Sequence, residues 1–153
     1  MIEAGTPAPE FELKADDGST VTLAGLRGRR VVLYFYPRDD TPGCTAQACG
    51  IRDQWQDFRG VDAVVLGVSP DDEASHRRFK EKYGLPFTLL ADTSHEVAEE
   101  YGVWGEKSYA GKTYMGVERS TFVIGADGNV AKVFHKVKPD EHARQVLEAL
   151  AGG

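Results

Sequence analysis

Two short runs of apolar residues constrain the fold of this chain more than any other feature. Residues 31–36 and 64–68 are rich in β-branched and aromatic side chains and contain no charged residue. Runs of this kind, without polar alternation, are typical of strands that are covered on both faces. The segment between them carries apolar residues at helical spacing, namely Cys44, Ala48, Ile51, Trp55 and Phe58. Strands that alternate with helices predict an α/β fold.

The rest of the chain extends this alternation. An Asp-Gly pair separates short apolar segments near the N-terminus and again near residue 127, and each place predicts a β-hairpin. The further expected strands are 11–13, 21–23, 87–90, 121–124 and 130–134, and the expected helices are 41–60, 71–83, 94–101 and 140–150. Residues 102–118 are expected to form a long loop or a hairpin. We predict a mixed sheet with helices on both faces, an N-terminal β-hairpin, and a single domain over residues 1–153.

Charge and hydrophobicity exclude several classes of protein. With 18 Lys and Arg against 24 Asp and Glu, the net charge of −6 argues against nucleic acid or an anionic membrane as the main partner. No apolar run approaches the roughly 18 residues of a membrane span, and the N-terminus lacks the pattern of a secretion signal. Two cysteines are too few for a disulfide scaffold. We therefore expect a cytoplasmic protein that binds neither nucleic acid nor membrane.

Cys44 is the first candidate for chemistry. Thr41 is a suitable N-cap and Pro42 a suitable first helical residue, so Cys44 is expected in the first turn of a helix. Unpaired backbone N–H groups and the helix dipole at that position favour a thiolate over a thiol. Cys44 also lies on the apolar stripe, however, and a buried, inert cysteine is the alternative.

The spacing of Cys44 and Cys49 limits how the two can react. Five helical residues correspond to a rise of about 7.5 Å and a rotation of about 140°, which puts the two Cα atoms about 8.6 Å apart. A disulfide needs them within roughly 7 Å. A permanent disulfide inside an intact helix is therefore excluded, and a catalytic one would require the first turns to unwind.

Metal binding is a weaker alternative for these cysteines. The two cysteines do not combine with the histidines in any spacing typical of a zinc site. We expect the four histidines to be surface or capping residues: His76, His95, His135 and His142.

The segment around Cys44 resembles the active-site signature of the peroxiredoxins. The pattern Pro-x-x-x-Thr-x-x-Cys is matched by Pro37, Thr41 and Cys44. The wider segment 34–49, with its second cysteine, is similar to the bacterioferritin comigratory protein (PrxQ) group. Similarity continues through 87–92, 101–107 and 118–124, and so covers nearly the whole chain in order.

The resemblance implies a thioredoxin-like fold and a thiol peroxidase activity that needs no metal, haem or flavin. Cys44 would be the peroxidatic cysteine, oxidised to a sulfenic acid, and Cys49 the resolving cysteine that condenses with it to an intramolecular disulfide. Thioredoxin or a similar dithiol would restore both thiols. Thr41 would hydrogen-bond the thiolate and the peroxide, and Pro37 would shield the sulfur.

The family match also selects Arg119, which would stabilise charge on the breaking O–O bond. From the residues alone, Arg119 is a surface arginine at a strand start, and Thr41 is a simple cap. The resemblance favours a monomer, for which an intrachain disulfide is sufficient.

Two other functions use the same cysteines. A thioredoxin-like disulfide reductase would have Cys-x-x-Cys, whereas four residues separate Cys44 from Cys49. A redox sensor would form the disulfide without turning over, so sustained peroxide consumption with a reductant distinguishes it from a peroxidase.

Overall fold

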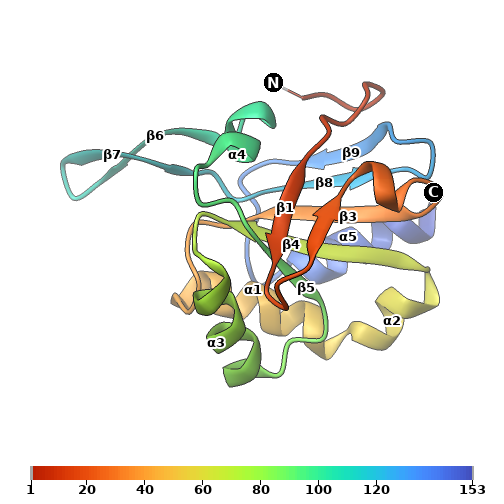
Figure 1. The fold of residues 1–153 in the computed structure, drawn as a ribbon, viewed down its shortest axis with the longest axis horizontal. Helices are drawn as coiled ribbons and strands as arrows, with labels where there is room; N and C mark the ends of the chain where they lie inside the picture. Colours follow the sequence, from red (N-terminus) through yellow and green to blue (C-terminus); the bar gives the residue numbers. More distant parts are fainter. Residues whose placement is uncertain (1, 153) are drawn as a thin grey trace.

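The computed structural model describes residues 2–152 and is built around one mixed sheet (Figure 1). The strand order is β2-β1-β5-β4-β3-β8-β9. The central strands β3, β4 and β5 are parallel, and every other pairing in this sheet is antiparallel. Its strands are Glu12–Ala15 (β1), Thr20–Thr22 (β2), Arg30–Phe35 (β3), Ala63–Ser69 (β4), Thr88–Ala91 (β5), Ser120–Ile124 (β8) and Val130–Phe134 (β9). The α/β fold, the mixed sheet and the N-terminal hairpin are confirmed.

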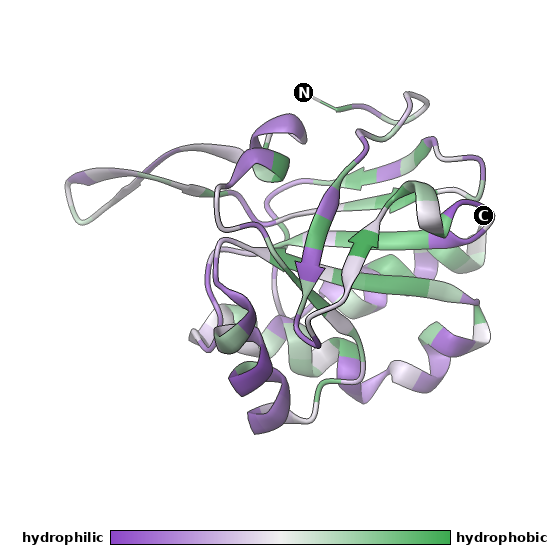
Figure 2. Cartoon of the chain, viewed as in Figure 1, coloured by the Kyte–Doolittle hydropathy of each residue, from purple (hydrophilic) through white to green (hydrophobic). Residues whose placement is uncertain are grey.

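Strand β3 is apolar throughout because it has a core on each side. It lies between β4 and β8, and its alternate residues enter different hydrophobic clusters. Val32 and Tyr34 pack on one face, whereas Leu33 and Phe35 pack on the other. Figure 2 shows β3 and β4 as predominantly hydrophobic strands inside a more hydrophilic shell.

Helices cover both faces of the sheet, but unevenly. The face that carries Tyr34 is covered by four helices, whereas the opposite face is covered by the N-terminal segment, a short 3₁₀ helix and α4. The four helices are Pro42–Asp53 (α1), Trp55–Gly60 (α2), Glu73–Tyr83 (α3) and His142–Gly152 (α5); α4 is Glu96–Glu100 and the 3₁₀ helix is Ala24–Leu26. No helix within residues 2–152 is both long and apolar enough to cross a membrane.

The expectation of one helix over residues 41–60 is wrong at Gln54. The backbone of Gln54 leaves the helical conformation, with φ −107° and ψ 22°, so that α1 ends at Asp53 and α2 begins at Trp55. Ile51 and Phe58 nevertheless pack into the same cluster. The apolar stripe therefore continues across the break, which is why helical spacing alone did not reveal it.

Residues 104–117 form a separate two-stranded hairpin that projects from the sheet (Figure 1). Its strands are Trp104–Tyr109 (β6) and Lys112–Val117 (β7). Ala110 and Gly111 form the turn with φ 53° and 78°, the positive values of a type I′ hairpin turn. This outcome settles the choice between loop and hairpin for residues 102–118.

Candidate active site

The loop after β3 delivers the chain to the start of α1. Pro37 follows directly after Tyr36, whose N–H still donates to the Val68 carbonyl of β4 at 3.0 Å. Asp40 adopts the left-handed conformation, with φ 55°, and so turns the chain into the helix. Its carboxylate accepts from Lys82 Nζ and Tyr83 Oη, both at 2.7 Å, and these bonds lower the pKa of Asp40. The end of α3 thereby helps to hold the loop.

Thr41 occupies the N-cap position of α1, with φ −101° and ψ 153°, and Pro42 is the first helical residue. The Thr41 hydroxyl does not cap the helix; it donates instead to the Arg38 carbonyl at 2.9 Å. The N–H groups of Gly43 and Cys44 belong to the first turn and have no partner within the helix by position. The positive end of α1 therefore remains available beside Cys44.

Cys44 is almost completely buried, with 2% of its surface exposed. It packs in the cluster that contains Tyr34, Tyr36 and Ala48. Cys49 is half-buried on the same helix, and both cysteines are free thiols. This agrees with the expectation that an intact helix keeps the two apart.

Arg119 is brought to the same helix from a distant part of the sequence. It lies in the short link between β7 and β8, directly before the strand rather than within it. Its Nη1 donates to Gln47 Oε1 at 2.6 Å, and its backbone carbonyl accepts from the Val137 N–H at 3.0 Å. The guanidinium is thus held against the first two turns of α1, where Cys44 lies.

Two residues of this arrangement, Gly43 and Gln47, were not identified as site residues from the sequence. A Cβ at position 43 would lie 3.1 Å from Arg119 Nη2, so glycine permits the close approach of the guanidinium. Gln47 is fully buried and orients Arg119. A polar residue on the apolar side of α1 was the one signal in the sequence that could have identified Gln47.

The expectation of surface or capping histidines is wrong for His76 and His142, which are 0% and 1% exposed. His142 Nε2 lies 2.7 Å from Thr121 Oγ1. Burial, and then the nearby charge of Arg119, lower the pKa of His142 to about 3, so its ring is neutral. His95 is at the N-cap of α4 and His135 is exposed, as expected. Within residues 2–152, no three His, Cys, Asp or Glu residues are placed to hold a metal ion.

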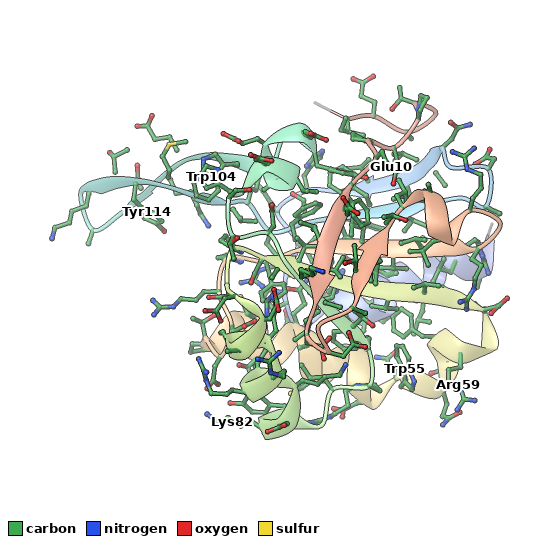
Figure 3. The ribbon with its side chains drawn as sticks, viewed as in Figure 1. Glu10, Trp55, Arg59, Lys82, Trp104 and Tyr114 are labelled. Atoms are coloured by element: carbon green, nitrogen blue, oxygen red, sulfur yellow. The ribbon has the colours of Figure 1, made fainter. Side chains whose placement is uncertain are left out.

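Two cavities lie elsewhere on the molecule than at the Cys44 thiol. Pro37 is half-buried and lines a groove of about 370 Å³ together with residues of the projecting hairpin, including Trp104 and Tyr114. A larger cavity of about 510 Å³ lies beside Trp55 and Arg59 of α2, far from that hairpin (Figure 3). Neither cavity is lined by Cys44, Thr41 or Arg119. A buried thiol at a helix start, near a fixed guanidinium, suits reaction with a small substrate on which negative charge develops as it reacts.

Comparison with protein families gives one match that covers most of the chain. The AhpC/TSA family pattern matches residues 4–133. Peroxiredoxin Bcp of Bacillus subtilis (strain 168) is 50% identical over 149 residues, which cover 97% of this chain and 95% of that protein. Peroxiredoxin Bcp of Escherichia coli (strain K12) is 48% identical over 149 residues, with 97% and 96% covered.

Solved structures agree with this match. The Xanthomonas campestris bacterioferritin comigratory protein, described for its alkyl peroxide reduction activity, superimposes with a TM-score of 0.91 at 35% identity, over 98% of each chain. A cysteine-to-serine mutant of Xylella fastidiosa PrxQ gives a TM-score of 0.93 at 31% identity, over 99% of this chain and 97% of that one.

Proposed function

Because this chain belongs to the AhpC/TSA family, as a peroxiredoxin of the Bcp/PrxQ group, we propose which of its residues carry out the reaction of that family. The protein is a thiol-dependent peroxidase that reduces hydroperoxides to water or alcohols. The observation that carries the residue assignment is the meeting of Cys44 and Arg119 at the first turns of α1.

In the first step, the Cys44 thiolate attacks the terminal oxygen of the peroxide. A sulfur–oxygen bond forms as the O–O bond breaks, so that sulfur is oxidised to sulfenic acid and the departing alkoxide or hydroxide takes a proton. Arg119 and the Cys44 backbone N–H stabilise the charge that develops on the oxygens. The Thr41 hydroxyl donates to the Arg38 carbonyl, so it must turn away from that carbonyl before it can bind the peroxide. Pro37 limits access of water to the sulfur.

In the second step, the Cys49 thiol attacks the Cys44 sulfenic acid. A disulfide forms and water leaves, which conserves the oxidation state gained from the peroxide. The start of α1 must unwind for this step, because helical geometry keeps the two Cα atoms beyond disulfide range. A dithiol then reduces the disulfide by exchange and is itself oxidised.

We assign the dithiol role to thioredoxin or a similar protein.

Both cysteines lie on one chain, so a monomer is sufficient for the cycle. Two free thiols suit the reducing cytoplasm. The central sheet draws strands from most of the chain, which supports a single domain over residues 1–153.

The direct test of this cycle is the intact mass and thiol count of reduced protein after one equivalent of hydrogen peroxide. The expected result is loss of two hydrogens, loss of both thiols and no covalent dimer. If the mass and both thiols persist, the peroxidase assignment fails. Continued peroxide consumption with thioredoxin and its reductase then separates an enzyme from a sensor that reacts once.

A matched pair of variants tests the two cysteine roles. Cys44→Ser should abolish peroxide reduction, because no sulfur remains at the helix start. Cys49→Ser should consume one equivalent of peroxide and then stall or overoxidise. Peroxide consumption at the wild-type rate by Cys44→Ser would contradict the nucleophile assignment, and unchanged thioredoxin-driven turnover by Cys49→Ser would contradict the resolving role.

A further inference from the structure

A buried histidine–aspartate pair ties the loop that leads to Cys44 to α3. Asp39, two residues before the N-cap Thr41, has a side chain only 4% exposed, and the His76 side chain of α3 is 0% exposed. His76 Nδ1 lies 2.7 Å from Asp39 Oδ2. His76 Nε2 lies 2.9 Å from the Leu90 carbonyl oxygen of β5. The imidazole therefore joins the active-site loop to the sheet.

These two contacts require a proton between His76 and Asp39. The Leu90 carbonyl can only accept, so Nε2 must carry a hydrogen. At 2.7 Å, Nδ1 and the carboxylate must also share a hydrogen, because two lone pairs at that distance repel. Removal of the shared proton, or a change of tautomer, would leave one of the two contacts with no hydrogen to donate.

Several polar groups face this pair. Besides the Leu90 carbonyl, they are the Tyr36 hydroxyl, which donates to Asp39 Oδ1 at 2.6 Å and lies 3.4 Å from Nδ1, and the Ser75 hydroxyl, which donates to Oδ2 at 2.7 Å. Asp71 is the other nearby charge. Burial opposes the charged ring and is the largest influence, but the Asp39 hydrogen bond and charge, the Leu90 carbonyl and Asp71 together raise the pKa of His76.

A further set of hydrogen bonds fixes the backbone of the loop. The Asp39 N–H donates to Asp71 Oδ2 at 2.7 Å, and Asp71 is in turn held by the Ser69 hydroxyl at 2.7 Å. The other side-chain anchor described above, Asp40 with Lys82 and Tyr83, is exposed to solvent and hence weaker. Asp39 is thus the buried anchor of residues 37–41.

We propose that His76 is a positioning residue, and that the proton it shares with Asp39 holds residues 37–41, and hence the first turn of α1, in place. We call His76 and Asp39 the proton latch. Loss of the proton releases the loop and allows Cys44 to reach Cys49. This last consequence rests on the proposed function, whereas the latch itself does not.

The direction of the pH effect follows from proton linkage. Because the pKa of His76 is raised when the loop is closed, the protonated ring stabilises the closed loop fully at pH values below the ordinary histidine pKa of 6.5. The stabilisation is lost as pH rises from there to the raised pKa. Because one proton is involved, the opening constant should rise by up to about tenfold per pH unit in this window and then level off.

Amide hydrogen exchange of the reduced protein, corrected for intrinsic exchange rates, measures opening of residues 39–45 as a function of pH. Wild type should show the rise and plateau. His76→Asn, which keeps a neutral donor near Asp39, should open more at pH 6.5 and show no such rise. His135→Asn, which removes an exposed histidine, should match wild type. A flat profile in wild type, or an equal rise in His76→Asn, would overturn the latch.

Titration of the His76 ring by NMR in wild type needs no variant and tests the latch independently. Its pKa should exceed 6.5, and in Asp39→Asn it should fall below 6.5 because burial then dominates. A wild-type value at or below 6.5 would overturn the proposal.

The catalytic consequence is tested at constant pH, where ionisation of Cys49 cancels between proteins. After a peroxide pulse, His76→Asn should form the disulfide faster than wild type at pH 6.5, by the ratio of their opening constants, and at the same rate above the latch pKa. Equal rates at pH 6.5 would overturn the link to Cys49. Absence of any disulfide in every protein would count against the proposed function, while the exchange profiles would still decide the latch.

Discussion

At residue 43, the lack of a side chain decides how closely Arg119 can approach α1. A Cβ there would lie 3.1 Å from Arg119 Nη2 and 3.6 Å from Pro139 Cγ. Arg119 is also tied to Gln47 at 2.6 Å, so the guanidinium cannot move aside without breaking that bond. The position of the cation therefore depends on a glycine that makes no polar side-chain contact.

Gly43→Ala should slow oxidation of Cys44 by roughly tenfold to a hundredfold, because displaced Arg119 stabilises developing charge less well. Stopped-flow measurement of the peroxide reaction gives this rate. Gly50→Ala is the matched control on the same helix, since its Cβ would meet only Ala143 at 3.9 Å. It should leave the rate unchanged and stabilise the fold by up to about 1 kcal/mol. Equal rates for Gly43→Ala and wild type would contradict the role of Gly43.

Residues selected from the sequence were those marked by local pattern or by family signature. Cys44 stood out because Thr41 and Pro42 mark a helix start. Gly43 and Gln47 were missed because their importance lies in contacts with Arg119, more than 70 residues away. Spacing along the chain carries no information about such contacts.

At the scale of elements, α1 both presents Cys44 and keeps it from Cys49. Its first turn supplies unpaired N–H groups, while its continuous hydrogen bonds preserve the separation of the two cysteines. In the proposed cycle, the helix must therefore be stable enough to organise the reduced site and weak enough at its start to unwind after oxidation. The free-energy difference between the helical and unwound states of residues 42–49 sets this balance.

Ala46→Gly should accelerate disulfide formation by about fivefold, because glycine costs a helix about 1 kcal/mol relative to alanine. Ala46 is exposed, so no packing is lost. Quenched-flow mass spectrometry after a peroxide pulse follows the disulfide. Ala149→Gly makes the same change within α5 and should leave this rate unaltered. If both variants accelerate the step equally, unwinding of α1 is not what limits it.

The ends of α1 were predicted with unequal success. Its start was correct, since Thr41 and Pro42 fit their positions without reference to the rest of the protein. Its end at Asp53 was missed, because Gln54 is neither glycine nor proline and the apolar spacing continues to Phe58. Both helices pack into the same cluster on the sheet, so the break does not interrupt the apolar stripe.

Across the whole molecule, the pKa values of two buried histidines are shifted in opposite directions. His76 faces two acceptors and its pKa is raised, whereas His142 faces the Thr121 hydroxyl with Arg119 nearby and its pKa is lowered to about 3, so its ring is neutral. Their effects on the free energy of unfolding oppose each other. Protonation of His76 stabilises the fold at low pH, and exclusion of a proton from His142 destabilises it there.

His142 should cause a loss of stability below pH 6.5. Its pKa is lowered from 6.5 to about 3, so between these values the unfolded chain takes up a proton that the folded protein does not. This costs up to about 1.4 kcal/mol per pH unit. His142→Gln should reduce the pH slope of the free energy of unfolding by nearly one proton, as measured by urea denaturation from pH 7 to 4. His135→Gln should keep the wild-type slope, and an unchanged slope in His142→Gln would contradict the assignment.

The sequence by itself determined the local features of this protein. Apolar periodicity indicated the central strands and most helices, capping residues located the start of α1, and helical geometry separated Cys44 from Cys49. Each depends on neighbours along the chain, whose backbone repeats are known in advance. Only the tertiary structure decided the strand order, the approach of Arg119 to Gly43 and Gln47, and the pairing of His76 with Asp39. These features depend on which surfaces pack together and which polar groups are buried between them. A polar group must find a hydrogen-bond partner once it is buried, and burial occurs only when the chain has folded.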